Sequence, residues 1–322
     1  MPIIDMPLED LRRYGGRNPR PDDFDHYWAR ALDELGATPP DLELRPSPFA
    51  APGSECFDLY FTGVRGARIH AKYLRPAAAA PRHPAIVHFH GYAGNAGSWM
   101  DKLSWVQMGF SVAAMDVRGQ GGSSEDPGGV RGNTLRGHIV RGLSDEPDNL
   151  LFRHIFLDTV RLVQLMMEQP EVDPDRVGVT GWSQGGGLTV AAAALEPRVW
   201  RAAPVYPFLS DYRRVWEMDL ARDAYQEIRD YFRLFDPEHG REDEIFTRLG
   251  YIDVQHLAPR IRGAVLWGTG LMDTVCPAST QFAAYNRITA PKSMVIYPDF
   301  GHEPLPDMHD HIAGFMLRES AT

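Results

Sequence analysis

A serine flanked by glycines is the first candidate for chemistry. Residues 181–185 read Gly-Trp-Ser-Gln-Gly, after an apolar run at 177–179 and before a stretch of small residues. On a tight strand-to-helix turn, glycines two positions either side of the serine relieve crowding, and the hydroxyl stands clear of the sheet. We therefore predict that Ser183 is a nucleophile. The alternative is a glycine-rich turn in which Ser183 only caps a helix.

A serine hydroxyl needs a base to take its proton and an acid to orient that base. Asp273 follows one apolar run of the chain and His302 follows the next. Serine, acid and histidine occur in this order in α/β-hydrolases, so we predict the triad Ser183, Asp273, His302. Asp299 is a competing acid, but it lies in the same loop as His302, so Asp273 is favoured. As alternatives, Asp273 caps a helix and His302 is a surface loop residue.

Acyl transfer also needs two N–H donors for the negative oxygen that develops during attack. The residue after the nucleophile supplies one, which is the main-chain N–H of Gln184. The loop after the third strand supplies the other. Here that loop contains Tyr92, whose N–H we predict as the second donor and whose phenol lines the acyl pocket or packs nearby. Trp182, beside the nucleophile, is predicted to contact substrate.

Two further motifs suggest other chemistry but lack the residues it needs. His88 and His90 place two imidazoles on one strand face, yet no HExxH motif accompanies them. Residues 119–122 resemble a phosphate loop only in glycine content, because the GK[ST] ending is absent. We therefore expect no metal and no cofactor. Arg118 and Asp116 are expected to tie loops together near the site.

The elements that must position these residues alternate between strands and helices. Residues 57–61 and 68–74 alternate apolar and polar residues around a glycine turn, which predicts an antiparallel hairpin that opens a sheet. Later runs are fully apolar, which is typical of a parallel sheet covered by helices on both faces. These runs are residues 85–89, 110–115, 177–179, 202–205, 264–267 and 294–297.

Helical spacing fills the intervals between the strands, including a segment that ends before Pro170. Residues 208–258 are rich in charged and aromatic residues and contain no apolar strand, which predicts a helical insertion over the active-site edge of the sheet. Residues 1–40 are polar and are expected to form an N-terminal arm with a helix at 23–35. Together, residues 1–322 are interpreted as one α/β domain.

Composition narrows the possible partners. The chain has 322 residues, with 33 Lys and Arg against 43 Asp and Glu, and the net charge of −10 comes without a basic run. Nucleic acids and anionic membranes are therefore unsuitable partners. Cys56 and Cys276 lie far apart with no CxxC motif, which fits a reducing compartment. No apolar run reaches membrane-spanning length and the first residues include acidic ones, so we expect a cytoplasmic protein.

Several stretches, in fixed order along nearly the whole chain, resemble the acetyl xylan esterase and cephalosporin C deacetylase family, carbohydrate esterase family 7. They are residues 18–28 (NPRPDDFDHYW), 89–94 (FHGYAG), 116–121 (DVRGQG), 181–187 (GWSQGGG), 270–286 (GLMDTVCPASTQFAAYN) and 297–303 (YPDFGHE). The resemblance implies an α/β-hydrolase fold with the same triad and the same two oxyanion donors as above. It implies a metal-free acyl-enzyme route that deacetylates short acetylated sugars and cephalosporins, in a cytoplasmic hexamer.

Two departures from the family bear on substrate choice. Residues 149–152 read NLLF where the family tends to carry consecutive tyrosines, and Trp182 stands where a small residue is often found.

A peptidase or an acyltransferase that uses the same triad is an alternative function. A catalytically dead binding protein is another, although such a protein is expected to lose a triad residue. The natural acetylated substrate, its regiochemistry and the physiological pathway stay open.

Overall fold

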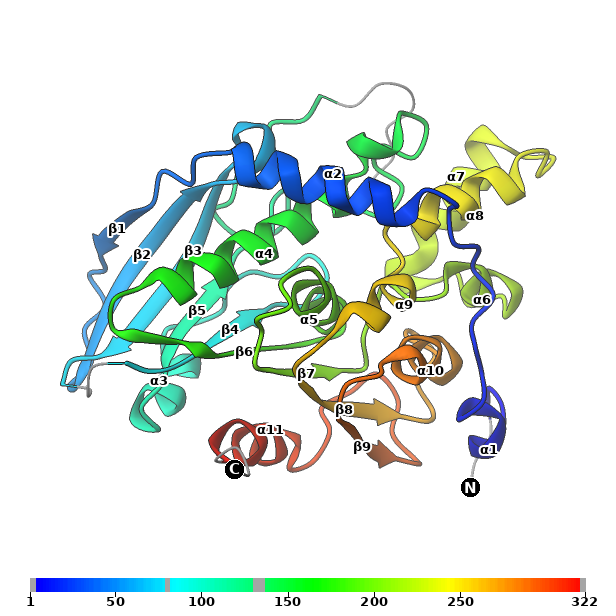
Figure 1. The fold of residues 1–322 in the computed structure, drawn as a ribbon. Coiled ribbons are helices and arrows are strands. Elements are labelled where there is room, and N and C mark those ends of the chain that lie inside the picture. Colours follow the sequence, from blue (N-terminus) through cyan, green and yellow to red (C-terminus); the bar gives the residue numbers. More distant parts are fainter. Residues whose placement is uncertain (1–3, 79–81, 130–136, 319–322) are drawn as a thin grey trace.

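A single twisted sheet runs through the molecule, with helices on both of its faces (Figure 1). The structure, a computed structural model, describes residues 4–78, 82–129 and 137–318. Within these residues the sheet has nine strands in the order β1-β2-β3-β5-β4-β6-β7-β8-β9. The pairings among the first three strands and between β3 and β5 are antiparallel, and all later pairings are parallel. The predicted α/β fold with a mostly parallel sheet is therefore confirmed.

The strands coincide closely with the apolar and alternating runs of the sequence. They are β1 (Glu43–Pro46), β2 (Ser54–Thr62), β3 (Arg68–Pro76), β4 (His83–Phe89), β5 (Ser111–Met115), β6 (Val172–Trp182), β7 (Arg201–Val205), β8 (Ala264–Gly270) and β9 (Lys292–Tyr297). One expectation is wrong: the hairpin of β2 and β3 does not open the sheet, because β1 pairs with β2 and lies at the edge. Its four residues include a proline and two charged side chains, so they lack the apolar pattern that marks the other strands.

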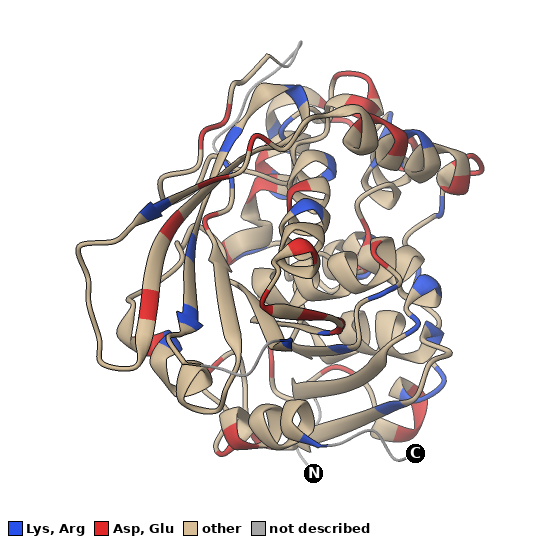
Figure 2. Ribbon diagram, turned by 60° about the vertical axis from the view of Figure 1, so that its left-hand side comes forward, with Lys and Arg blue, Asp and Glu red and all other residues tan. Residues whose placement is uncertain are grey.

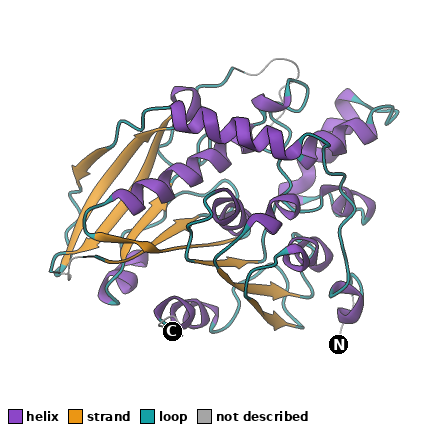
Figure 3. Cartoon of the chain, viewed as in Figure 1, coloured by secondary structure: helices purple, strands orange, loops and turns teal. Residues whose placement is uncertain are grey.

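The helices flank the sheet (Figure 3). They are α1 (Leu8–Leu11), α2 (Phe24–Ala37), α3 (Met100–Gln107), α4 (Leu151–Glu168), α5 (Gln184–Leu195), α6 (Tyr212–Glu217), α7 (Gln226–Phe235), α8 (Glu242–Gly250), α9 (Val254–Leu257), α10 (Ala278–Arg287) and α11 (Met308–Leu317). None of the described helices is both long and apolar enough to span a bilayer. Acidic and basic residues are interspersed over the ribbon (Figure 2).

Two hydrophobic cores lie on opposite faces of the sheet. Helices α4 and α5 pack on one face with α2, and α3 and α11 cover the other (Figure 1). Strand residues alternate between the two cores: Val87 of β4 packs with α4 and α5, while its neighbour Ile86 packs with Trp105 of α3. This alternation follows from the two-residue period of a strand, and burial on both faces accounts for the continuous apolar runs of the central strands.

The segment between β7 and β8 contains only helices among its described elements. It comprises α6, α7, α8 and α9 with two short 3₁₀ turns, Asp223–Tyr225 and Ala258–Arg260. The N-terminal segment runs beside it: the main-chain N–H groups of Arg17 and Asn18 donate to the buried carboxylate of Asp211 at 3.0 and 2.8 Å. Trp28 of α2 donates its indole N–H to the carbonyl of Tyr251 at 3.0 Å. These contacts hold residues 17–28 against the helical segment.

Candidate active site

The turn between β6 and α5 holds Ser183 in an unusual conformation. Its φ is 59° and its ψ is −118°, a region that non-glycine residues rarely occupy. The turn is fixed by three main-chain hydrogen bonds, in which Ser183 donates to Val205 while its carbonyl accepts from Gly187 and Phe208, each at 3.0 Å. Strand β6 ends at the residue before Ser183, and helix α5 begins at the residue after it. The predicted strand, turn and helix around this serine are therefore all present.

The glycines beyond the serine allow α5 to approach the sheet closely. A Cβ on Gly185 would lie 2.0 Å from the carbonyl oxygen of Phe89, and one on Gly187 would lie 2.4 Å from that of Phe208. Both distances are far inside van der Waals contact, so a side chain at either position would push the helix away. Gly185 therefore sets the distance between the serine turn and the end of β4, and Gly187 sets the distance between α5 and the segment after β7.

Ser183, His302 and Asp273 meet at the carboxyl edge of the sheet. The Ser183 hydroxyl lies 3.0 Å from Nε2 of His302, and Nδ1 of that imidazole lies 2.8 Å from Asp273. With the Nδ1 proton donated to the carboxylate, Nε2 is left to accept the serine proton. The structure thus brings together the three residues that the sequence singled out, from the ends of β6, β8 and β9.

Asp273 is held on both of its oxygens. Oδ2 accepts from His302, while Oδ1 accepts the main-chain N–H groups of Val275 and Cys276 at 2.9 and 2.7 Å. Its side chain is fully buried. Asp299, the competing acid, is exposed. The geometry therefore favours Asp273 as the partner of the imidazole.

The two predicted oxyanion donors lie on segments joined by a glutamine. Gln184 begins α5, so its main-chain N–H has no carbonyl partner one turn earlier in the helix. Its side chain makes two hydrogen bonds with Gln120, at 2.7 and 2.9 Å, and Gln120 also accepts the N–H of Ala93 at 2.9 Å. Gln120 thereby ties the loop that contains Tyr92 to the serine turn.

The glycine-rich segment 119–122 has a structural explanation. The main-chain N–H of Gly121 donates to Gly94 at 2.9 Å, and a Cβ on Gly121 would lie 2.8 Å from the carbonyl of Ala93. Asp116, just before it, accepts N–H groups from Ala96 and Ser123 at 2.6 and 2.8 Å. The segment thus lies directly against the loop that follows β4, as the loop-tying role predicted for Asp116 requires.

Arg118 reaches further, into the core. Its guanidinium makes two hydrogen bonds of 2.6 Å to Asp158 of α4, and both side chains are almost fully buried. A bidentate ion pair of this kind fixes the end of β5 against α4. The role of Arg118 is therefore in the packing between strand and helix.

Comparison with known proteins places this chain in a family. The family model described as "Acetyl xylan esterase (AXE1)" matches residues 1–319. The chain belongs to the acetyl xylan esterase family. As a member it is a carboxylic ester hydrolase, and the family supports hydrolysis of acetyl esters. The resemblance noted in the sequence is thereby confirmed.

Two solved structures are similar to this chain over nearly the whole length of both proteins. Acetyl xylan esterase 1 from Thermoanaerobacterium sp. JW/SL YS485 is 62% identical, with a TM-score of 0.96 over 98% of this chain and 99% of that one. The acetyl xylan esterase from Paenibacillus sp. R4 is 35% identical, with a TM-score of 0.93 over 97% and 99%. Acetyl esterase Axe7A of Xylanibacter ruminicola is 29% identical over 286 residues. That match covers 86% of this chain but only 62% of Axe7A.

Two groups near the triad of this esterase carried no signal in the sequence. The ring of Tyr206 packs on that of His302, with centroids 4.6 Å apart, and Trp182 packs on Tyr206 at 5.4 Å. Glu227 of α7 accepts a hydrogen bond from the Tyr92 phenol at 2.7 Å. Burial raises the pKa of Glu227, although its hydrogen bonds act in the opposite direction. Contacts between such distant segments leave no local pattern from which a sequence could reveal them.

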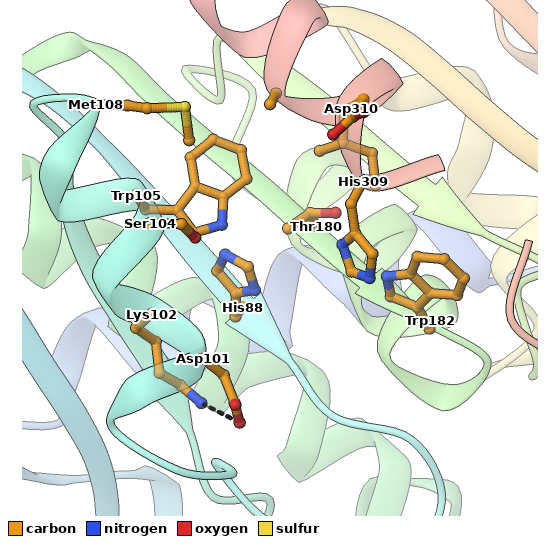
Figure 4. A pocket seen from close by; sticks show the side chains of 12 residues that line it. His88, Asp101, Lys102, Ser104, Trp105, Met108, Thr180, Trp182, His309 and Asp310 are labelled. Atoms are coloured by element: carbon orange, nitrogen blue, oxygen red, sulfur yellow. Dashed lines mark ion pairs between the residues drawn. The ribbon is translucent and has the colours of Figure 1, made fainter. Parts of the chain in front are cut away.

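The ring of Trp182 faces a second cavity. Its ring packs against Tyr206 and against His309 of α11, at 5.4 and 4.9 Å, and it lines a cavity between α3 and α11 (Figure 4). The side chains of the triad do not line that cavity. The predicted contact between Trp182 and substrate stays a prediction.

Within the described residues, one group of side chains has the spacing of a metal site. It consists of Asp273, Cys276 and His302, whose donor atoms all lie within 4.8 Å of one another. Burial raises the pKa of the Cys276 thiol well above its usual range, with the Asp273 carboxylate adding to the effect. A protonated thiol is a poor metal ligand, and the other two groups already bond each other.

His88 and His90 do not converge on a common site. Nε2 of His90 accepts the N–H of Val117 at 3.0 Å and Nδ1 lies 2.7 Å from the carbonyl of Gly91, so both of its nitrogens are engaged. His88 lines the cavity beside Trp182 (Figure 4). The expected absence of a metal stays a prediction.

Proposed function

We propose that this esterase removes acetyl groups from short acetylated xylo-oligosaccharides and from cephalosporin acetates, through an acetyl-enzyme formed on Ser183. The observation that carries the proposal is the continuous hydrogen-bonded chain from the serine hydroxyl through His302 to Asp273. The similarity to two proteins named acetyl xylan esterases supports the choice of acetyl sugars as substrates.

In the first half of the proposed reaction, Nε2 of His302 takes the hydroxyl proton while the serine oxygen forms a bond to the acetyl carbon. The carbonyl oxygen becomes negative, and the main-chain N–H groups of Tyr92 and Gln184 stabilise it. Asp273 stabilises the imidazolium that results. The bond from the acetyl carbon to the sugar oxygen then breaks, and His302 returns its proton to that oxygen.

In the second half, water replaces the sugar. Its proton passes to His302 as its oxygen bonds to the acetyl carbon, and the same two N–H groups stabilise the negative oxygen. The bond to Ser183 then breaks, the serine regains its proton and acetate leaves. An alcohol in place of water would give acetyl transfer, which is the reaction of the alternative acyltransferase.

The helical segment 208–258 is proposed to cover the site. Support comes from α7, where Glu227 bonds to the Tyr92 side chain, and from the contact of Phe208 with the same ring at 5.7 Å. A cover of this kind limits the size of the alcohol part of the ester. Short oligosaccharides are therefore the proposed substrates rather than polymeric xylan.

We also propose a hexamer in the cytoplasm. Both cysteines are free and buried, which suits a reducing compartment. Strand β1 lies at the end of the strand order and leaves an unpaired edge among the described residues, and such edges are usually covered. Light scattering that returned a monomer mass would contradict the hexamer.

Rates on a series of p-nitrophenyl esters, measured beside acetylated xylo-oligosaccharides and a cephalosporin acetate, test the substrate proposal. We expect acetate esters to react fastest, with one acetate released per ester cleaved. Ser183→Ala should lower the turnover by about a thousandfold or more while leaving the melting temperature nearly unchanged. Retention of more than about a tenth of the wild-type turnover would exclude Ser183 as the nucleophile.

Chelation tests the metal-free route separately. EDTA should leave the rate on p-nitrophenyl acetate unchanged, because the proposed steps use only protein groups and water. A loss that added zinc restores would instead favour a metal held at the triad or near His88 and His90.

A further inference from the structure

A cavity of about 650 Å³ lies between α3 and α11, on the face of the sheet opposite α5 (Figure 4). Its lining comes from β4, β6 and both helices, and includes His88, Trp105, Thr180, Trp182 and His309. Small-molecule sites typically measure about 300 to 1,000 Å³, so the cavity is large enough for a ligand. Because the triad side chains are not part of the lining, it is distinct from the ester-cleaving site.

Two tryptophans form opposite walls of the cavity (Figure 4). Trp105 projects from α3 and packs edge-on to His88, with ring centroids 5.8 Å apart. Trp182 stands at the end of β6, and the imidazole of His309 lies against it at 4.9 Å and an angle of 33°. Trp105 is 7% exposed and Trp182 is half-buried, so each indole presents only part of its apolar surface to a ring that fits between them.

The floor of the cavity carries a polar atom without a partner. Nε2 of His88 is buried and makes no hydrogen bond to any residue that the structure describes. Burial lowers the pKa of His88 to about 3, with the nearby charges of Lys102 and His309 acting in the same direction. The imidazole is therefore neutral and offers one donor and one acceptor. A buried polar atom left unpaired is unfavourable, and a ligand hydroxyl would satisfy it once the imidazole turns this nitrogen toward the cavity.

The charges around the cavity favour a neutral ligand. Nζ of Lys102 donates to the carbonyl of Ser98 at 2.9 Å and lies 3.9 Å from the carboxylate of Asp101. Asp101 and Asp310 are exposed and bring negative charge to the rim, so positive and negative groups occur together. A charged ligand, whether anion or cation, would therefore meet groups of its own sign as well as groups of the opposite sign. A molecule with apolar ring faces and neutral hydroxyl groups suits the walls and the floor.

We propose that this cavity binds one neutral sugar unit of a xylo-oligosaccharide without acting on it. The ring lies between Trp105 and the paired rings of Trp182 and His309, and a hydroxyl exchanges a hydrogen bond with Nε2 of His88. The choice of sugar rests on the proposed function, whereas the existence of a site for a neutral hydroxylated ring does not. Trp182 connects this site to the triad, since it precedes Ser183 and packs on Tyr206, which packs on His302.

Titration of the full-length Ser183→Ala protein with xylotetraose, which carries no acetyl group, tests the proposal. Ser104→Trp adds bulk at an exposed position that lines the cavity, and His88→Leu removes the unpaired nitrogen. Met100→Trp adds the same bulk to the same helix at a position that is 65% exposed and outside the lining, and serves as the matched control. Binding is followed by tryptophan fluorescence and by calorimetry.

We expect xylotetraose binding to weaken about tenfold or more in Ser104→Trp and His88→Leu and to be unchanged in Met100→Trp. Equal binding in Ser104→Trp and Met100→Trp would overturn the proposal. The absence of xylotetraose binding at millimolar concentration would also overturn it. A smaller particle mass of Ser104→Trp in light scattering would overturn it too, because that result would assign the cavity to an interface between copies of the chain.

The proposed esterase activity is read separately, in the same variants with Ser183 restored. Hydrolysis of p-nitrophenyl acetate should be the same in Ser104→Trp and Met100→Trp, because neither position touches the triad. Loss of sugar binding with this rate intact would support the second site. Failure of the parent protein to cleave acetyl esters would contradict the proposed function while leaving the binding result interpretable.

Discussion

The phenol of Tyr92 donates a hydrogen bond of 2.7 Å to Glu227, and this contact joins the loop after β4 to helix α7. The other carboxylate oxygen of Glu227 accepts the N–H of Val140 at 3.0 Å, and the side chain is buried. Gln120 holds the same loop from the side of the serine turn. The main chain of Tyr92, proposed to face the oxyanion, is thus fixed from two directions, and Glu227 is a positioning residue.

Glu227→Gln should lower kcat and leave KM nearly unchanged. An amide can accept a hydrogen bond only at its oxygen, so if that oxygen accepts from Val140, the contact with Tyr92 is reversed into an amide donating to the phenol and loses its charged acceptor. We expect kcat to fall about tenfold, less than the ~10²- to 10³-fold that follows removal of an oxyanion donor outright. Tyr92→Phe, which removes only the phenol oxygen, should give the same loss. Asp230→Asn, in the neighbouring part of α7, is the control, and a change confined to KM would contradict the positioning role.

Asp273→Asn should be far more damaging than Asp299→Asn. The amide would favour the wrong tautomer of His302 and could not stabilise the imidazolium, so we expect kcat to fall by about 10⁴. Asp299 is exposed, and its substitution should change kcat by less than about twofold. Both rates are measured on p-nitrophenyl acetate. A larger loss from Asp299→Asn would mean that the acid has been misassigned.

The triad geometry was accessible from sequence because each of its residues lies in the turn or loop that follows a strand. Parallel strands end at one edge of a sheet, so the apolar runs before Ser183, Asp273 and His302 were enough to place them together. The same logic located the loop with Tyr92. The family stretches, which run from the N-terminal arm to the loop with His302, supplied the rest of this prediction.

What the sequence did not reveal depends on contacts between distant segments. Trp182 shares its motif with the nucleophile, yet a strand sends successive side chains to opposite faces, and its ring lies in the cavity between α3 and α11. Strand β1 is short and polar and takes its place only by pairing with β2. Glu227 lies in a helix whose periodicity predicts the helix but says nothing about which loop it touches.

His70 gives stability that should depend on pH. Burial acts to lower its pKa, but hydrogen bonds of 2.7 and 2.9 Å to Asp116 and Asp58 outweigh burial and raise the pKa above its usual value of 6.5. A raised pKa in the folded state means that the stabilisation is complete below pH 6.5 and is lost as the pH rises through the folded-state value. For Asp116, whose pKa is lowered to about 2, the loss occurs instead as the pH falls below 3.8.

His70→Gln should therefore reduce the free energy of unfolding most between about pH 4 and pH 6.5, by on the order of 1–2 kcal/mol, and progressively less at alkaline pH. Urea unfolding at pH 6 and pH 9 measures the difference. His26→Gln, which removes an exposed imidazole from α2, is the control. An equal effect of His70→Gln at both pH values would show that the imidazole contributes only as an uncharged group.

Gly185→Ala tests the close approach of α5 to the end of β4. Its Cβ would lie 2.0 Å from the carbonyl oxygen of Phe89, and the three nearest atoms all belong to the main chain of Phe89 and His90, so no flexible side chain can move aside. The helix and the loop that carries Tyr92 must separate, so we expect a loss of about 1–3 kcal/mol of stability. We also expect a fall in kcat, because the two proposed oxyanion donors lie on the separated segments.

The matched control is Gly36→Ala in α2, where a Cβ would meet no atom within 4 Å. Alanine in that helix should stabilise the protein by up to about 1 kcal/mol, because it lowers the entropy of the unfolded chain without a clash. Thermal melts and rates on p-nitrophenyl acetate separate the two substitutions. If Gly185→Ala kept both the wild-type melting temperature and the wild-type kcat, the glycines would not set the distance between the serine turn and the loop with Tyr92.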